Sequence, residues 1–466
     1  MKTFWIRTLL IVLFAAWSCG KDSPEVPDDP GPAVPTTLTL SSESVEAASS
    51  GGSFPITVNA PVRPSAKSNA DWVSIKDGTY KDYSLTYTLE VKTFNEIGER
   101  EATVTVTSGS LSKTVNIKQK GLEIPEIVKV DLATELVTPH PIVQAQALYN
   151  YLLSQYGKNI LSSTAADVAW NSTVADYVFN TTGKYPAINC FDFIHICVPE
   201  NNWINYNDIS PVKNWADAGG IVSLMWHFNV PLSETTVVDA GGNGLSFYSD
   251  RTSYKASNAL KEGTWENKWF YEQLEKTANV ILKLQDEGIA ALWRPFHEAA
   301  GNYYALKWKG SAWFWWGDDG PEVCKQLWNA MYDYFTAKGI RNLIWVWTAQ
   351  NYNGDMSSFD SDLPFYPGDG KVDVVARDIY GGSVYGCGVE FAQLQNAYPH
   401  KMIALGECGY SDSAQFPSLS DGWNAGAKWS WFMPWSAAGP STMVSAEWWK
   451  DAFSMDYVIT RDEIKF

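Results

Sequence analysis

The stretch Ala290-Ala-Leu-Trp-Arg-Pro-Phe-His-Glu298 decides how the larger part of this chain folds. Its apolar run, residues 290–296, has the length of a buried strand. An amphipathic segment, residues 265–287, precedes it and is long enough to form a helix that crosses over a sheet. A helix followed by a buried strand is the repeating unit of a parallel α/β sheet, so this stretch predicts such a sheet.

The same alternation continues from about Pro139 to the end of the chain and opens with a helix expected at residues 141–156. Eight apolar runs have the length and composition of strands: 160–163, 187–196, 221–226, 290–296, 343–348, 372–380, 402–406 and 429–435. Amphipathic stretches lie between them, at residues 322–338, 391–397 and 444–453 among others. Eight strand-helix units predict a (β/α)8 TIM barrel over residues 122–466, with its chemistry at the carboxyl ends of the strands.

A different pattern fills residues 38–121. Short alternating runs occur at residues 54–58, 72–75, 85–91 and 102–107, and Gly, Pro, Asn and Asp interrupt them. No segment of helical period lies between these runs. The pattern therefore predicts a small all-β sandwich of the immunoglobulin-like kind ahead of the barrel.

The first residues have the features of an export signal. Residues 1–18 carry Lys2 and Arg7 before an apolar run that is too short to span a bilayer, which is typical of a secretory signal peptide. The following Ser18-Cys19 resembles a bacterial lipoprotein signal, in which Cys19 receives the lipid. The alternative is an ordinary signal peptide with a chance cysteine.

Residues 19–37 are rich in Pro and acidic residues, so we expect an extended tether. Its start also resembles the surface-export signal of Bacteroidetes lipoproteins. The expected location is the outer membrane, at the cell surface, and an orientation toward the periplasm stays open. A membrane contact is expected only through the lipid.

Composition limits the partners. A net charge of -17 and a pI near 4.8 argue against nucleic acid, because nucleic-acid binding needs basic patches. The 23 Trp and 23 Tyr suit sugar rings as well as a protein core. The five cysteines after Cys19 are an odd number, so their pairing is left open. No phosphate loop, zinc signature or dinucleotide fingerprint occurs, and we expect neither a cofactor nor a metal, and a monomer.

Two predicted strands end in glutamate. The fourth ends in His297-Glu298 and the seventh in Gly406-Glu407. Because the carboxyl ends of barrel strands share one rim, the two glutamates can face each other. A retaining glycosidase needs two carboxyl groups about 5 to 5.5 Å apart, one protonated and one ionised. The competing interpretation is that Arg294 and Glu298 form a structural ion pair.

Five motifs occur in the order seen in glycoside hydrolase family 26: Trp226-His227, Arg294-Pro-Phe-His-Glu298, Trp313-Phe-Trp-Trp-Gly317, Asp378-Ile-Tyr-Gly381 and Gly406-Glu407. The resemblance covers roughly residues 139–466. It implies a (β/α)8 barrel and, as the commonest activity, a retaining endo-1,4-β-mannanase that acts on β-mannan polysaccharide or oligosaccharide. Residues 69–75, 95–106 and 115–121 resemble the BACON domain, for which we favour a spacer role over sugar binding.

The resemblance also implies roles for single residues. Glu298 is expected to be the acid/base, with a raised pKa, and Glu407 the nucleophile. Substrate contacts are expected from His227, Arg294, His297, Trp316, Tyr380 and Trp435. Of these, Tyr380 orients Glu407, Trp316 stacks on a sugar ring, and Trp435 stacks on sugar or belongs to the core. The loop at residues 299–312, which includes Trp308, is longer than is common in the family.

Other functions fit parts of the pattern. A β-1,3-xylanase or a mixed-linkage glucanase would share the catalytic pair, because substrate choice lies in loops. A surface glycan-binding protein without catalysis would share the lipid anchor, the BACON-like domain and the tryptophans. Endo and exo action are not distinguished, and residues 230–264 could block or extend one end of the cleft.

Overall fold

The computed structural model describes residues 34–167, 169–303, 310–350, 363–410, 415–436 and 443–465. The predicted signal peptide, Cys19 and most of the tether lie outside these residues, and so does Trp308. The chain divides into two compact units, the first built mainly from residues 53–90 and 102–117 and the second mainly from residues 118–466. The two units are described separately below.

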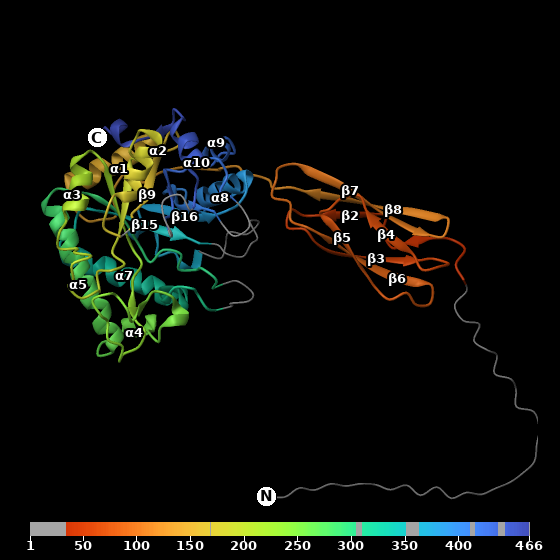
Figure 1. The fold of residues 1–466 in the computed structure, drawn as a ribbon, viewed down its shortest axis with the longest axis horizontal. Helices are drawn as coiled ribbons and strands as arrows, with labels where there is room; N and C mark the ends of the chain where they lie inside the picture. The colour runs from red at the N-terminus through yellow and green to blue at the C-terminus, as the bar shows by residue number, and fades with distance from the viewer. Residues whose placement is uncertain are drawn as a thin grey trace, which may run out of the picture. The chain divides into compact units, whose positions relative to one another are not determined.

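The first unit is a sandwich of two four-stranded sheets, with strand orders β1-β3-β6-β5 and β2-β8-β7-β4. Its strands are β1 Thr39–Leu40, β2 Ser44–Ala47, β3 Gly52–Asn59, β4 Ser65–Ser68, β5 Val73–Asp77, β6 Ser84–Val91, β7 Glu99–Ser108 and β8 Leu111–Lys120. In β6, Leu85, Tyr87 and Leu89 are buried while Thr86 is exposed, so every second side chain enters the core. The predicted all-β domain is confirmed (Figure 1).

The second unit is a closed parallel barrel. Its sheet runs β10-β11-β14-β15-β16-β17-β18-β9, a further pairing of β10 with β9 closes it, and β19 adds a short strand beside β9. The strands are β9 Ile160–Ala165, β10 Ile188–Asp192, β11 Ile221–Trp226, β14 Ala291–Pro295, β15 Leu343–Ala349, β16 Val374–Tyr380, β17 Met402–Gly409, β18 Trp431–Pro434 and β19 Val458–Ile459. The (β/α)8 barrel predicted from the apolar runs is confirmed.

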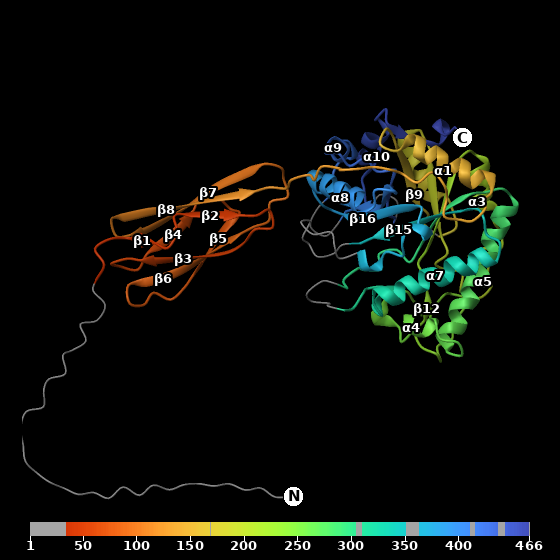
Figure 2. The ribbon, with the colours of Figure 1, turned by 180° about the vertical axis from the view of Figure 1, so that it is seen from behind.

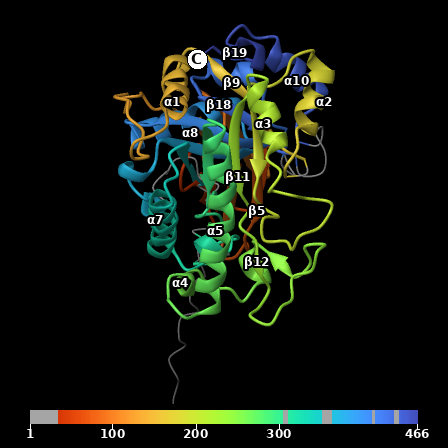
Figure 3. The same cartoon turned by 90° about the vertical axis from the view of Figure 1, so that its left-hand side faces the viewer.

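Helices surround the barrel, as Figures 2 and 3 show. They are α1 Val143–Gln155, α2 Thr173–Thr182, α3 Ser210–Asp217, α4 Ala256–Ala259, α5 Trp265–Asp286, α6 Trp315–Asp318, α7 Pro321–Ala337, α8 Val384–Ala397, α9 Leu419–Asn424 and α10 Ala446–Phe453. Phe270 and Leu274 lie one turn apart on α5 and are fully buried in the same cluster as Trp293 of β14. Within the described residues, no helix is both long and apolar enough to cross a bilayer.

One helix starts earlier than its sequence pattern predicts. We expected a helix at residues 391–397, and α8 begins at Val384. Gly386 and Gly388 weaken the helical pattern there, because glycine is a poor helix former. The Ser383 side chain accepts a hydrogen bond from the Gly386 amide, and this cap fixes the true start.

The cysteine question has a clear answer in the described residues. Cys190, Cys197, Cys324, Cys387 and Cys408 are all buried free thiols. Neither the sandwich nor the barrel is therefore held by a disulfide in this structure.

Candidate active site

A cavity of about 340 Å³ opens at the carboxyl ends of the barrel strands. Its wall combines both predicted catalytic glutamates with histidines and aromatic residues: His227, Phe247, Tyr248, His297, Glu298, Phe314, Tyr380, Glu407 and Trp435. A larger hollow of about 490 Å³ lies along residues 195–207 and α5, and neither glutamate lines it. Chemistry, rather than size, marks the smaller cavity as the candidate active site.

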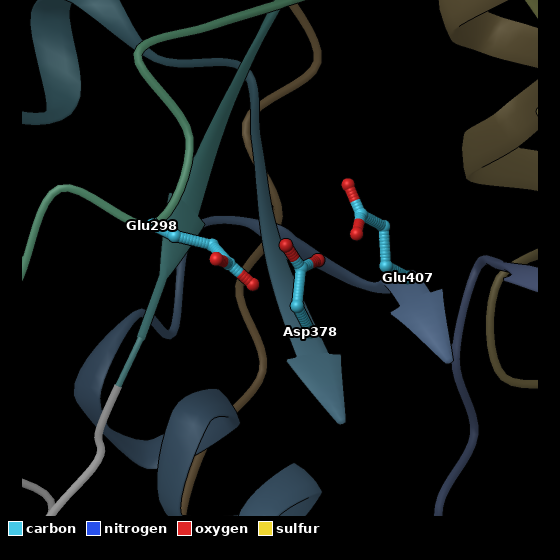
Figure 4. Close-up of side chains that lie close together, drawn as sticks. All are labelled: Glu298, Asp378 and Glu407. Carbon is cyan, nitrogen blue, oxygen red and sulfur yellow. The ribbon is translucent and has the colours of Figure 1, made fainter. Parts of the chain in front are cut away.

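Three carboxyl groups meet at this cavity. One oxygen from each of Glu298, Asp378 and Glu407 lies within 4.8 Å of the other two. Asp378 on β16 pairs in register with Glu407 on β17, and Glu298 follows the end of β14. Figure 4 shows Asp378 between the two glutamates. The fold thus brings together two glutamates that lie more than a hundred residues apart in the sequence.

The backbone that carries Glu298 is strained. Phe296 and Glu298 have φ angles of 48° and 52°, a left-handed conformation that residues with side chains seldom adopt. Two hydrogen bonds hold the turn between them. The Trp316 indole donates to the His297 carbonyl at 2.9 Å, and the Gly301 amide donates to the Glu298 carbonyl at 2.9 Å. Strain held in this way fixes the direction of the Glu298 side chain.

Arg294 lies behind the cavity instead of lining it. Its Nη1 donates to Glu407 Oε1 at 2.7 Å, its Nη2 donates to Asp378, and its Nε donates to Thr348 at 2.8 Å. The side chain is only 3% exposed. Arg294 forms its ion pairs with Asp378 and Glu407, not with Glu298 as in the competing interpretation, and the substrate contact predicted for Arg294 stays a prediction. A β14 side chain that points into the barrel meets the carboxylates of β16 and β17.

Glycine is required directly before Glu407. A Cβ atom at Gly406 would lie 2.6 Å from Asp378 Oδ1 and 3.3 Å from Arg294 Nε. Both distances are shorter than ordinary van der Waals contact, so a side chain here would displace Asp378 or Arg294. The single positive charge of Arg294 is shared between two of the three carboxyl groups, and this fixed cation disfavours a metal ion beside it.

Burial and neighbouring charges raise the pKa of two of the three carboxyl groups, Glu298 and Asp378. Burial raises the pKa of Glu298 well above its usual range, and the charges of Asp378 and Glu407 raise it further. Burial also raises the pKa of Asp378 to about 7, although Arg294 opposes this effect. A side-chain interaction with Asp378, in which protonated Glu298 is the donor, also raises the pKa of Glu298. Glu407 accepts hydrogen bonds from Arg294 and from the Tyr380 hydroxyl.

Two histidines stand side by side in the cavity wall. His227 Nδ1 lies 2.6 Å from Asp192 Oδ2, and His227 Nε2 lies 3.2 Å from His297 Nε2. Burial, the proximity of the His227 ring and the charge of Arg294 lower the pKa of His297 well below its usual range, so His297 is neutral. The sequence analysis missed Asp192, which ends β10. Its signal was a polar residue inside an apolar run that we expected to continue to residue 196.

The stacking role predicted for Trp316 is not available in this structure. Trp316 has no exposed surface, and its indole is bonded to the His297 carbonyl. Phe314 lines the cavity instead, with its ring centroid 4.5 Å from that of Trp316. Trp435, directly after β18, is half-buried in the wall, with its ring centroid 5.4 Å from that of His227.

An insertion after β11 supplies the remaining wall. It lies within residues 230–264, which we expected to block or extend one end of the cleft, although the sequence did not single out Phe247 and Tyr248. Its hairpin pairs β12 Val230–Pro231 with β13 Leu245–Ser246, and Phe247 and Tyr248 follow. The Ser249 amide donates to the Trp313 carbonyl at 2.9 Å, and the Trp315 amide donates to the Phe247 carbonyl at 3.1 Å. The insertion therefore extends the wall of the glutamate cavity. The neighbouring loop at residues 299–312 lies partly outside the described residues.

A (β/α)8 barrel with two neighbouring glutamates at its strand ends, of which Glu298 has a raised pKa, has the architecture of a retaining glycoside hydrolase. The comparison with known families agrees. Residues 137–463 match glycosyl hydrolase family 26, and the chain belongs to this family. Residues 63–120 match the BACON family, described as a putative N-terminal binding domain. Both predicted resemblances are confirmed.

Known proteins of similar sequence and structure are mannanases by name. A mannan endo-1,4-beta-mannosidase from Thermothelomyces thermophilus is 34% identical over 71% of this chain. The family 26 domain of an endo-beta-mannanase/endo-beta-glucanase from Prevotella bryantii is 55% identical, covers 72% of this chain and 100% of that domain, and has a TM-score of 0.69.

A third similar protein was solved with a ligand. It is a beta-mannanase from a symbiotic protist of the termite Reticulitermes speratus, in complex with gluco-manno-oligosaccharide. It is 31% identical, covers 72% of this chain and 99% of that chain, and has a TM-score of 0.58. The matched regions are only part of the curated relatives: they span 63% of the Thermothelomyces protein and 48% of a Piromyces mannosidase.

Proposed function

We propose that this protein is a retaining endo-1,4-β-mannanase. The observation that carries the proposal is the unequal environment of two glutamates whose oxygens lie within 4.8 Å of each other. Burial and negative neighbours favour the protonated form of Glu298, whereas Glu407 accepts hydrogen bonds from Arg294 and Tyr380. This short separation suits direct attack by a carboxylate, since inverting enzymes need about 6.5 to 9.5 Å for an intervening water.

The proposed reaction is a double displacement. In the first step Glu407 attacks the anomeric carbon, the glycosidic C–O bond breaks, and Glu298 gives its proton to the departing oxygen. In the second step Glu298 takes a proton from water, the water oxygen bonds to the anomeric carbon, and Glu407 is released. Arg294 and Tyr380 each hold one oxygen of Glu407, so the carboxylate reaches the sugar in a fixed orientation.

Asp378 has a supporting role in this proposal. As a carboxylate it accepts the hydrogen bond from protonated Glu298, and its negative charge opposes ionisation of Glu298. Arg294 compensates the charge of Asp378, which makes a third buried acid tolerable. The pair Asp378 and Arg294 thereby keeps Glu298 ready to donate a proton near neutral pH.

Support for β-mannan as the substrate comes from the relatives. Every curated relative named above is an endo-1,4-beta-mannosidase, and the protist enzyme was solved with a gluco-manno-oligosaccharide. The cavity wall adds Phe247, Phe314 and Trp435, whose flat faces can cover the apolar faces of sugar rings. Mannan, galactomannan and glucomannan all present such faces.

The decisive experiment measures reducing ends released from galactomannan, β-1,3-xylan and mixed-linkage glucan by the full chain. We expect release from galactomannan, with products of several lengths from the start because internal bonds are cut. Activity on one of the other glycans alone would replace the proposed substrate. If no glycan is cleaved while galactomannan still binds, the protein is a glycan-binding protein without catalysis.

We also propose that Cys19 carries a lipid that anchors the protein at the outer membrane, on the cell surface. Support comes from the Ser18-Cys19 pair after the apolar run and from the acidic, Pro-rich tether. Cys19 lies outside the described residues. In this arrangement a monomer would meet polysaccharide at a distance from the membrane.

The sandwich is proposed to act as a spacer. Among its described residues, 34–121, the large hydrophobic side chains that are well exposed are aliphatic: Val34, Val62 and Ile97. The aromatic side chains Phe54, Trp72, Tyr80, Tyr83 and Phe94 are half-buried, so none of them belongs to the well-exposed set. Deletion of residues 38–120 should leave hydrolysis of soluble galactomannan nearly unchanged. A large loss of activity on soluble substrate would contradict the spacer role.

A further inference from the structure

Asp192 holds the histidine wall in a specific way. Its Oδ1 accepts hydrogen bonds from two backbone amides, that of Ile194 at 2.9 Å and that of His227 at 3.0 Å. Its Oδ2 lies 2.6 Å from His227 Nδ1. The carboxyl group is 7% exposed, and the two amides prevent it from rotating. Oδ1 therefore binds the backbone, and Oδ2 binds the His227 ring.

These contacts give the hydrogen bonds a direction. An ionised carboxylate can only accept, so His227 must carry its proton on Nδ1. In neutral His227 the Nε2 atom is then an acceptor. Because His227 Nε2 lies 3.2 Å from His297 Nε2, the proton between these two nitrogens must belong to His297. The hydrogen bonds thus form a series in which His297 donates to His227 and His227 donates to Asp192.

At the His297 end of this hydrogen-bond series, the Nδ1 atom is an acceptor without a donor. With its proton on Nε2, neutral His297 has a lone pair on Nδ1. His297 Nδ1 is buried and has no hydrogen-bond partner among the described residues. A buried polar atom without a partner is costly, and such atoms concentrate at functional sites. His297 lines the cavity beside Glu298, where a donor from a bound sugar could satisfy it after a small shift.

We propose that Asp192 is a positioning residue for the reaction proposed above, because it fixes the tautomers of His227 and His297 through one directed chain of hydrogen bonds. Asp192 touches neither the cavity nor the glutamates. It acts by deciding which nitrogen atoms in the wall donate and which accept when a sugar binds. The inference rests on the proposed function for its catalytic consequence, but the tautomers can be measured without any activity.

The variant Asp192→Asn tests this role with almost no change in shape. The amides of Ile194 and His227 hold the side-chain oxygen in the Oδ1 position, so the amide NH2 group must take the place of Oδ2. It then donates to His227 Nδ1, and His227 must move its proton to Nε2. His297 Nε2 becomes an acceptor and its proton moves to Nδ1, which reverses the whole chain.

The direct measurement is the two-bond 1H–15N NMR correlation of the histidine rings at pH 8, where ordinary histidines are neutral. The chain contains only five histidines, so each ring can be assigned by substitution. In the wild type we expect the proton on Nδ1 of His227 and on Nε2 of His297. Any other pair of tautomers overturns the proposal, whether or not Asp192→Asn folds and whether or not mannan is the substrate.

Kinetics give the second measurement. Asp192→Asn should show both tautomers inverted, an unchanged Tm and a kcat/KM on galactomannan lowered about ten- to hundredfold, since mispaired donors or acceptors then face the sugar. Asp208→Asn is the matched control. Asp208 is an exposed aspartate between β10 and α3 whose Oδ1 accepts a hydrogen bond from the Ser210 amide, and its replacement should alter neither the NMR correlations nor kcat/KM. An Asp192→Asn protein with inverted tautomers and unchanged kcat/KM would refute the positioning role.

Discussion

The pair formed by Glu298 and Asp378 predicts how activity should depend on pH. Glu298 must be protonated to act as an acid, so activity is lost on the alkaline side as Glu298 ionises. Asp378 opposes that ionisation through its charge and its hydrogen bond. In Asp378→Asn the negative charge is removed, and Arg294 also loses one of its two carboxylate partners. Both changes favour the ionised form of Glu298, and the alkaline limb should move to lower pH.

The size of this effect follows from the geometry. The two carboxyl groups lie within 4.8 Å of each other; at that upper limit and an effective dielectric constant of about 20, two unit charges interact by roughly 3.5 kcal/mol. One pH unit corresponds to about 1.4 kcal/mol, so the interaction is equivalent to about 2.5 pH units. Rearrangement of Arg294 and entry of water will reduce it. We therefore expect the alkaline limb to fall by at least about one pH unit.

The assay is the pH profile of kcat/KM on a soluble mannan for the wild type and for Asp378→Asn. Asp333→Asn is the control, because Asp333 is an exposed acid on α7 that pairs with Lys371 far from the cavity. Its profile should match the wild type. An alkaline limb that stays in place in Asp378→Asn would show that Asp378 does not hold the proton on Glu298. A shift to higher pH would contradict the electrostatic reasoning itself.

The roles of the glutamates predict different azide products. Rescue of Glu298→Ala on an activated aryl mannoside should give the β-azide of retained configuration, and rescue of Glu407→Ala should give the inverted α-azide; swapped products, read by NMR, would reverse the roles. Trp435→Ala should raise KM for galactomannan about three- to tenfold through loss of stacking, whereas Trp203→Ala, which removes an exposed indole outside the cavity, should not; equal KM values for the two would refute stacking by Trp435. The Cys19→Ala variant should be released from the membrane fraction, and its activity per molecule should be unchanged. Continued sedimentation of this variant with membranes would rule out the lipid.

Periodic features of the sequence predicted the fold well. The eight strands of the barrel are buried on both faces, and such strands are continuous apolar runs that sequence reveals directly. Glu298 and Glu407 were found because they directly follow two of these runs. Arg294 was identified as well, but its partner was not, since the sequence cannot show which neighbouring strand an inward side chain meets.

The aromatic wall of the cavity was harder to predict. Residues 313–316 are four consecutive aromatic residues, and sequence alone gives each of them the same chance to face sugar. The backbone turns into α6 at Trp315, so the indoles of Trp315 and Trp316 bond to buried carbonyls and Phe314 is left at the surface of the cavity. Phe247 and Tyr248 belong to an irregular insertion, which has no periodicity to interpret.

The five buried thiols can report unfolding of the barrel, because a thiol reagent reaches them only when the barrel opens. Burial raises the pKa of Cys190, Cys324 and Cys387 to about 12, so these side chains are nearly free of reactive thiolate while the barrel is closed. A thiol reagent should label them only in molecules that have opened.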